Sequence, residues 1–168
     1  MAIIVYSKPA CVYCDKTKAL LTRLGLEYTE KVVSKDLSLE ELFKEFVEKT
    51  GIPAAWTILG LSALPTKHPL NVGMVGMHGN YGPNVLTNEC DVLIAIGMRF
   101  DDRVTGNLDH YAKQAKVVHL EIDPAEINKN VYADFPVLGN VKETLKVLME
   151  LVQPNSHKEW HNRFKELY

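Results

Sequence analysis

The sequence predicts an α/β protein with three layers, in which a mostly parallel sheet of about five or six strands has helices on both faces, as in Rossmann-like and flavodoxin-like folds. Apolar, β-branched runs alternate along the chain with amphipathic helical segments, which is the pattern of βαβ units. The run DVLIAIG at 91–97 is typical of a parallel strand buried on both faces. Charged residues follow it directly, where α/β proteins place their ligand-binding loops.

Length and composition limit the class of protein. The chain has 168 residues, 46% of them hydrophobic, and a net charge of −2. We expect a single domain in three parts, over residues 1–36, 37–154 and 155–168. The charge predicts no binding to nucleic acid, and no apolar run is long enough to span a membrane. Three cysteines and the lack of a signal peptide favour reduced thiols in a cytoplasmic protein.

The first part of the chain has the order strand, helix, strand, over residues 2–6, 11–24 and 27–33. This places Cys11 at a helix N-terminus, where unpaired N–H groups and the helix dipole stabilise a thiolate, and Lys8 adds a nearby cation. Cys14 is within reach of a mixed disulfide formed by Cys11, which indicates thiol–disulfide exchange. Half of a zinc site and an inert pair of thiols are the alternatives.

The next segments continue the alternation, with a helix at 39–49 and a buried strand at 52–59. Ser38 and Glu41 have the spacing of a capping box, which predicts the start of this helix. Its apolar residues recur at i, i+3 and i+4, so one face should pack on the sheet.

A glycine-rich loop comes next and precedes a short helix at 80–89. Gly73, Gly76 and Gly79 are three glycines in seven residues, which allows the backbone to approach a ligand closely. A tight structural turn is the alternative interpretation.

Four charged residues follow the strand at 91–97: Arg99, Asp101, Asp102 and Arg103. Because the carboxyl ends of parallel strands line the crevice of an open α/β sheet, we expect this loop to bind a ligand. A surface ion-pair cluster is the alternative.

The last third of the chain contains two strands and two helices, over residues 116–122, 135–139, 141–152 and 156–167. Asp123 follows the first of these strands. Its carboxylate can accept hydrogen bonds from ribose hydroxyls, or cap the turn that begins at Pro124, and both can be true.

The final helix carries Trp160 and Phe164 one turn apart, so this aromatic stripe either folds back on the domain or pairs with another copy. No metal site is expected, because His157 and His161 have no carboxylate or cysteine ligand beside them. Cys90 is expected to be a buried apolar residue.

The sequence YSKPACVYCDKTKALL at 6–21, with GLEY at 25–28 and VSKD at 33–36, closely resembles the N-terminal half of a glutaredoxin. The resemblance implies that Cys11 is the attacking thiol, that Cys14 is the resolving thiol, and that Lys8 and Tyr13 help to hold glutathione. It covers about the first 36 residues. The Gly-Gly loop that completes the glutathione site of that family has no counterpart.

A second set of motifs begins near Phe43: GIP at 51–53, LGL at 59–61, HPL at 68–70, GMVGMHG at 73–79, GMRFDDRVTG at 97–106 and IDPAEINKN at 122–130. Together they resemble the central domain of acetolactate synthase, a thiamine-diphosphate enzyme that also carries FAD. The resemblance implies an FAD site formed by Gly76, Met77, His78, Gly79, Arg99, Asp101, Arg103, Ile122 and Asp123.

The two resemblances meet between Asp36 and Leu42. The glutaredoxin-like part replaces the opening strand and glycine-rich loop of the FAD domain. We find no Gly-Asp-Gly motif, and expect the two flanking thiamine-diphosphate domains to be absent, which excludes synthase activity. We interpret the chain as an engineered chimera that tests fold recombination, with no selected catalytic function, no required cofactor and no specific partner.

Two alternatives remain. One is a glutaredoxin-type thiol–disulfide oxidoreductase that acts through Cys11 and Cys14, with glutathione as its partner. The other is a module that binds FAD or another nucleotide. In each case we expect a monomer or a weak homodimer.

Overall fold

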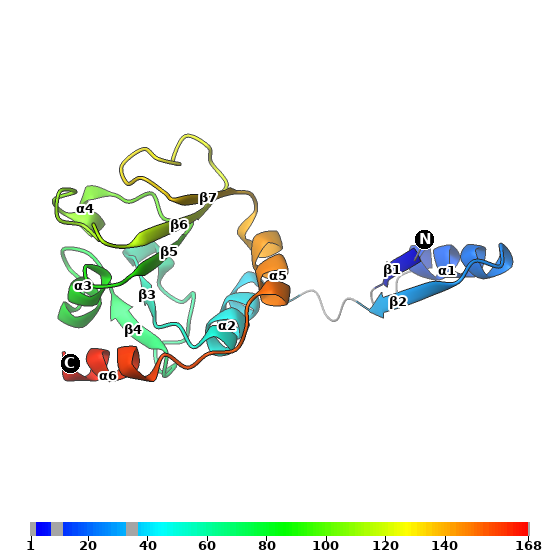
Figure 1. The fold of residues 1–168 in the computed structure, drawn as a ribbon, viewed down its shortest axis with the longest axis horizontal. Coiled ribbons are helices and arrows are strands. Elements are labelled where there is room, and N and C mark those ends of the chain that lie inside the picture. Colours follow the sequence, from blue (N-terminus) through cyan, green and yellow to red (C-terminus); the bar gives the residue numbers. More distant parts are fainter. Residues whose placement is uncertain (1–2, 8–11, 33–36, 168) are drawn as a thin grey trace. The chain divides into compact units, whose positions relative to one another are not determined.

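The computed structural model describes residues 3–7, 12–32 and 37–167. By its internal contacts the chain divides into two compact units, Met1–Leu37 and Ser38–Tyr168, called here the N-terminal and C-terminal units. Figure 1 shows the elements of each unit. None of the helices within the described ranges is long and apolar enough to cross a membrane.

The N-terminal unit has the predicted order of strand, helix and strand, namely β1 (Ile3–Ser7), α1 (Val12–Arg23) and β2 (Tyr28–Val32). The two strands pair in parallel. After α1, Gly25 adopts a left-handed φ of 67°, and the Leu26 N–H donates to the Leu21 carbonyl oxygen at 3.0 Å. This Schellman arrangement favours glycine, which explains the predicted stop at this position.

Helix α1 buries none of its residues. Leu20 and Leu24, which belong to its predicted apolar face, are 48% and 58% exposed. The Lys18 ammonium links the helix to β2 by donating to Glu30 at 2.8 Å. This hydrogen bond, with a second one to Asp15, raises the pKa of Lys18 to about 12. A two-stranded sheet with one helix buries little apolar surface, so this unit has a small core.

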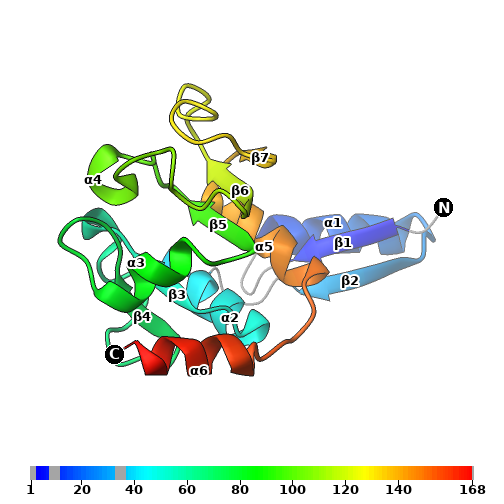
Figure 2. The same cartoon turned by 60° about the vertical axis from the view of Figure 1, so that its left-hand side comes forward.

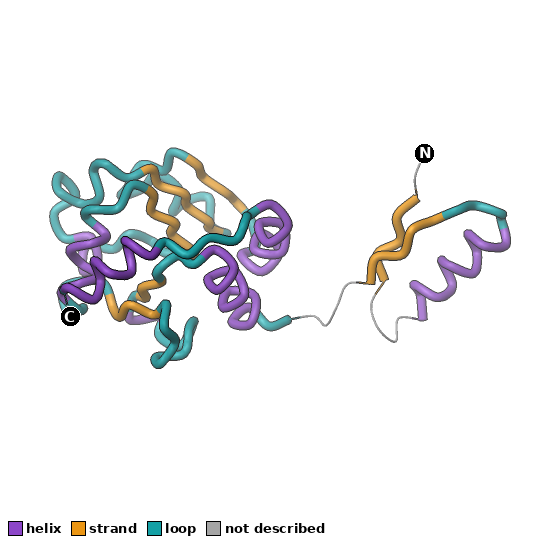
Figure 3. The backbone as a smooth tube through the Cα atoms, turned by 60° about the horizontal axis from the view of Figure 1, so that its bottom comes forward, coloured by secondary structure: helices purple, strands orange, loops and turns teal. Residues whose placement is uncertain are grey.

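The C-terminal unit alternates helices and strands as predicted. Its elements are α2 (Leu39–Thr50), β3 (Ala54–Trp56), η1 (Ile58–Gly60), β4 (Asn71–Met74), α3 (Tyr81–Thr87), β5 (Val92–Ile96), α4 (Asp102–Thr105), β6 (Lys116–Glu121), β7 (Phe135–Leu138), α5 (Val141–Leu151) and α6 (Lys158–Glu166). Figure 3 distinguishes these helices and strands by colour. The α/β class is therefore confirmed.

The strands do not form the one sheet of five or six strands that the sequence predicts. All described pairs are parallel, but they form three sheets: β1-β2, β3-β4 and β5-β6-β7. Strand β3 has only three residues, and its register with β4 shifts between Ala54 and Ala55. So short and irregular a strand offers few hydrogen bonds to a further neighbour.

The predicted start of α2 is confirmed. The Ser38 hydroxyl accepts from the Glu41 N–H at 3.1 Å, and the Glu41 carboxylate accepts from the Ser38 N–H at 2.8 Å. Helix α2 packs on α5, as Figure 2 shows. Leu42, Phe46 and Leu145 are buried on these two helices.

Strand β4 is absent from the sequence prediction, which assigns Gly73 to a loop. Asn71 and Gly73 both have low strand propensity, but the Asn71 side chain compensates locally. Its Oδ1 accepts from the Trp56 indole N–H at 3.1 Å and from the Gly73 N–H at 3.0 Å. These bonds tie β4 to the end of β3.

The predicted burial of β5 on both faces is wrong. Val92 is 49% exposed, and Ala95 is the one buried residue of the strand. Within the described residues β5 is at the edge of its sheet, with β6 as its hydrogen-bonded neighbour. Strand β5 thus has the apolar composition of a central strand, although most of its side chains are only partly buried. The predicted strand at 52–59 is likewise shorter and only partly buried.

Helix α6 folds back on its own unit, which settles the choice left open for the aromatic stripe. Phe164 is 7% exposed and packs in a cluster with Val72 and Leu86. Trp160 meets Phe164 edge to face, with ring centroids 5.8 Å apart. The His161 ring also lies 2.8 Å from the Gly51 carbonyl oxygen.

Candidate functional site

The connection from β4 to α3 forms a cradle around Gly76. This residue has a φ of +109°, and a Cβ atom on it would lie 2.8 Å from the Arg103 carbonyl oxygen. The Asn84 side chain on α3 accepts from the Gly76 N–H at 2.8 Å and donates to the Gly76 carbonyl at 2.9 Å. The Met77 N–H donates to the Arg103 carbonyl at 2.7 Å. Glycine is therefore required here by both conformation and space.

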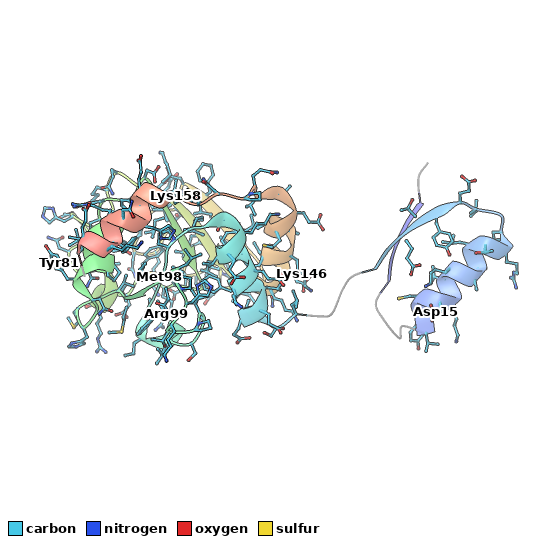
Figure 4. The ribbon with its side chains drawn as sticks, turned by 90° about the horizontal axis from the view of Figure 1, so that it is seen from below. Asp15, Tyr81, Met98, Arg99, Lys146 and Lys158 are labelled. Carbon is cyan, nitrogen blue, oxygen red and sulfur yellow. The ribbon has the colours of Figure 1, made fainter. Side chains whose placement is uncertain are left out.

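The charged loop after β5 faces this cradle. Asp101 caps the short helix α4 by accepting from the Arg103 N–H at 3.0 Å. That hydrogen bond is the main reason that the pKa of Asp101 is lowered, with smaller contributions from the charges of Arg103 and Arg99. Figure 4 labels Met98 and Arg99 on the stretch between β5 and α4.

The loop is not an ion-pair cluster. Among the described residues, the ion pairs within 4.0 Å include neither Arg99 nor Arg103. Both guanidinium groups can therefore bind an anionic ligand without first breaking a salt bridge.

A cavity of about 260 Å³ lies between the cradle and the loop. It is lined by residues of both and of helix α3: Val75, Gly76, Met77, Asn84, Thr87, Asn88, Asp102, Arg103, Val104, Thr105, Gly106 and Tyr111. Burial raises the pKa of the Tyr111 phenol well above its usual range, so this wall stays neutral. The cavity thus combines apolar walls, amide and hydroxyl groups, one arginine and one aspartate.

Three of the predicted cofactor residues, Gly76, Met77 and Arg103, line this cavity. Asp102, which belongs to the predicted ligand loop, also lines it, whereas Asn84, Thr87, Asn88 and Tyr111 were not among the predicted residues. The spacing of Asn84 and Asn88, one turn apart on the helix after a glycine loop, was a usable signal.

The other predicted cofactor residues lie outside the cavity lining. His78 is exposed, and a Cβ atom on Gly79 would collide with the Met74 backbone, so Gly79 serves the turn itself. Ile122 is 64% exposed. The Asp123 carboxylate accepts from the Ala125 N–H at 2.9 Å, so Asp123 caps the segment after it, as one of the two predicted roles requires. That segment is a turn and not a helix.

The predicted redox site is described only in part. Lys8 and Cys11 lie outside the described residues, while Tyr13 is 81% exposed in the first turn of α1. Cys14 is disulfide-bonded, which differs from the expectation of reduced thiols. Cys90 is a free, buried thiol, as expected, and its Sγ donates to the Thr87 carbonyl at 3.1 Å.

The described part of the chain contains no group of three or more His, Cys, Asp or Glu residues that could hold a metal ion. His161, one of the two histidines considered above, instead contacts the Gly51 carbonyl.

Comparison with known families identifies two components. Residues 31–148 match the central domain of thiamine pyrophosphate enzymes, and residues 3–57 match glutaredoxin. The chain therefore belongs to the thiamine pyrophosphate enzyme central-domain family, and its N-terminal part matches glutaredoxin over a range that overlaps the first match, as is consistent with a chimera.

Curated relatives specify the first component further. The chain is 47% identical over 133 residues to a probable acetolactate synthase large subunit of Methanocaldococcus jannaschii, a match that covers 76% of this chain and 22% of that protein. It is 42% identical over 127 residues to the chloroplastic acetolactate synthase 1 of Oryza sativa, covering 72% of this chain and 20% of that protein. The chain thus spans about a fifth of the length of these relatives.

Proposed function

We propose that this chain is a fusion of parts of two families with no selected catalytic function, and that its C-terminal unit binds a flavin or adenine nucleotide. The observation that carries the binding proposal is the cavity between the Gly76 cradle and the Arg103 loop. It lies where two loops leave the carboxyl ends of parallel strands, the usual place for a nucleotide in an α/β protein.

The cavity fits part of such a ligand. Its volume of about 260 Å³ is slightly below the usual range of ligand pockets, so it suits one ring system and not a whole dinucleotide. The glycine backbone permits close approach on one side. Asn88 and Thr105 add polar side chains to the lining, and hydrogen bonds to the backbone hold both in place. FAD would supply redox chemistry if bound, but the chain's own contribution would be binding and orientation.

The remainder of a nucleotide carries phosphate groups, which need cations. Arg103 lines the cavity, and Arg99 lies four residues before it, without a salt bridge in the described residues. Guanidinium groups bind phosphate in a bidentate manner. Asp101 and Asp102 oppose this charge, so we expect modest affinity that weakens as salt is added.

Titration of ADP and of FAD into the protein, followed by calorimetry, tests this proposal. Arg103→Met should weaken binding about tenfold, because a charge-assisted hydrogen bond is lost. Arg23→Met, an exposed change in α1, is the control and should leave binding unchanged. No heat of binding from either nucleotide, or equal effects of the two variants, would refute the nucleotide site.

Thiol–disulfide exchange of glutaredoxin type is the second candidate, and the disulfide of Cys14 in the first turn of α1 favours it. In this proposal Cys11 attacks with a lowered thiol pKa, Cys14 resolves the mixed disulfide, and Lys8 and Tyr13 hold glutathione. A glutathione-coupled reduction assay tests it. Activity that is lost in Cys11→Ser supports it, and activity equal to that of the Cys11→Ser variant counts against it.

We further propose that the C-terminal unit is a three-layer arrangement, with β3-β4 and β5-β6-β7 in its middle layer. The contacts of α2 with α5, and of α3 with α6, are consistent with two helical layers. We also propose that the protein is engineered, monomeric or weakly dimeric, and cytoplasmic. Sedimentation analysis over a concentration series tests the oligomeric state, and a stable dimer at all concentrations would contradict it.

A further inference from the structure

His119 on β6 is fully buried, and its ring points to the loop after β5. Its exposed fraction is 0%, and Nε2 lies 2.9 Å from the Met98 carbonyl oxygen. Because a carbonyl oxygen only accepts hydrogen bonds, Nε2 must carry the proton and donate it. The other nitrogen, Nδ1, has no hydrogen-bond partner among the described residues. The contact with Met98 therefore fixes the tautomer that carries its proton on Nε2.

Glu121 is a charged group close to this ring, but it does not replace Met98 as the partner. Its Oε2 lies 4.0 Å from Nε2, which is beyond hydrogen-bond distance. Its Oε1 instead accepts from the backbone N–H groups of Ile122 and Asp123, at 2.8 and 3.2 Å.

The same loop is held at neighbouring positions. The Gly97 N–H donates to the Leu120 carbonyl at 2.8 Å. The Asn130 side-chain amide donates to the carbonyls of Arg99 and Phe100, at 3.3 and 3.1 Å. With His119 on Met98, four consecutive residues of the loop are therefore bound to β6 or to the segment that follows it.

Phe100 adds an aromatic contact to these hydrogen bonds. Its φ of 53° is in the left-handed region, which a bulky residue adopts only when its surroundings require it. Its ring is 2% exposed and meets His119 edge to face, with centroids 5.0 Å apart. It also meets Tyr111, which lines the cavity, at 6.2 Å.

We infer that His119 is a positioning residue for the cavity, with Asn130 as its partner in this role. The loop that they hold continues into Asp102–Gly106, which forms one wall of the cavity. The Arg103 carbonyl then accepts the Met77 N–H of the opposite wall. His119 thus fixes the separation of the two walls without contacting a ligand. The inference rests on the proposed nucleotide site, although its structural part can be tested alone.

The test compares two substitutions of the buried ring. His119→Gln keeps a neutral N–H donor, whereas His119→Phe keeps an aromatic ring of similar size but has no donor. His110→Gln and His110→Phe are the controls, because His110 is an exposed histidine on a nearby turn. Circular dichroism establishes whether each variant is folded. If His119→Phe does not fold, Asn130→Ala replaces it, because it changes an exposed residue of the same hydrogen-bond network.

Two readouts need no nucleotide. Long-range ¹H–¹⁵N spectra of the wild type should show the tautomer with the proton on Nε2. Amide hydrogen exchange at Arg103–Gly106 should be about tenfold faster in His119→Phe and in Asn130→Ala, and close to the wild-type rate in His119→Gln. A proton on Nδ1, or unchanged exchange in both His119→Phe and Asn130→Ala, would overturn the inference.

The third readout is the affinity for ADP. It should fall about tenfold in His119→Phe and recover in His119→Gln, since one preorganising hydrogen bond is lost and restored. If the wild type binds no ADP or FAD, the nucleotide site has failed, while the tautomer and exchange results still decide the positioning role. If ADP binds equally to all variants, the positioning role has failed and the site stands.

Discussion

The Met77 N–H donates to the Arg103 carbonyl oxygen at 2.7 Å, and this bond joins the loop after β4 to the loop after β5. The two loops follow strands of two different sheets, and this bond brings residues 26 positions apart in the sequence together. The bond lies beside Gly76, where a Cβ atom would be 2.8 Å from the same oxygen. The close approach of these two loops defines the candidate site.

Gly76→Ala should therefore be strongly destabilising. Alanine rarely adopts a φ of +109°, and its Cβ would contact a backbone atom that cannot rotate away. We expect the free energy of unfolding to fall by about 2 kcal/mol, measured by urea denaturation. Gly139→Ala is the matched control, because a Cβ there meets only the Thr144 hydroxyl at an ordinary 3.6 Å. Equal stability of the two variants would contradict the cradle.

Asn84→Ala removes both hydrogen bonds between this side chain and the Gly76 backbone. Partly buried backbone groups then lose their partners, so we expect a loss of about 1–3 kcal/mol in unfolding free energy. Asn84→Asp should also destabilise, because a carboxylate can accept from the Gly76 N–H but cannot donate to its carbonyl. Asn107→Ala, which removes a local contact on an exposed turn, should have little effect. A stable Asn84→Asp variant would show that the donor is unimportant.

Because of Cys90, the free energy of unfolding should decrease at alkaline pH. Burial, and secondly the charge of Asp91, raise the pKa of its thiol to about 11. The folded state favours the neutral thiol. The buried thiol therefore makes its full contribution to stability below the pKa of an unfolded thiol, about 8.5. This contribution is lost as pH rises from there towards 11.

The measurement compares the unfolding free energy of wild type with that of Cys90→Ala across this range. The advantage of the wild type should be constant at neutral pH and should shrink as the solution becomes alkaline. A difference that stays constant to the upper end of the range would mean that the thiol is not shielded from water.

Phe164→Ala should detach helix α6 from its unit. The ring is 7% exposed and packs with Val72, Leu86 and Trp160. Its removal should lower the unfolding free energy by about 3 kcal/mol, with a red shift of the Trp160 fluorescence as the indole meets water. Val147→Ala on α5, where the side chain is 60% exposed, should cost much less. A Phe164→Ala protein as stable as Val147→Ala would mean that α6 is not docked.

Local signals in the sequence predicted the local structure well. The capping box of Ser38 and Glu41 forms as its spacing predicts, and Gly25 ends α1 in the left-handed conformation. Such motifs depend on residues within one turn of each other, so the rest of the chain has little influence on them. The order of strands and helices follows from the same kind of evidence.

Features that depend on distant pairing were predicted less well. The run at Val92–Ile96 has the sequence of a central strand, but within the described part of the chain it pairs with β6 alone, and Val92 is half exposed. Strand β4 was missed because its glycine and asparagine are stabilised by side-chain hydrogen bonds, which propensity does not include. The sequence also located Gly76 and Arg103, but not Tyr111, whose place at the cavity depends on packing against Phe100.

A series of ¹H–¹⁵N spectra, recorded as ADP and separately FAD is added to the protein, would show directly whether the cavity binds a nucleotide. We expect the amide resonances of Gly76, Met77, Arg103 and Thr105 to shift progressively and saturate, while those of α1 stay in place. Spectra that do not change, or shifts confined to residues outside the cavity, would contradict the nucleotide site.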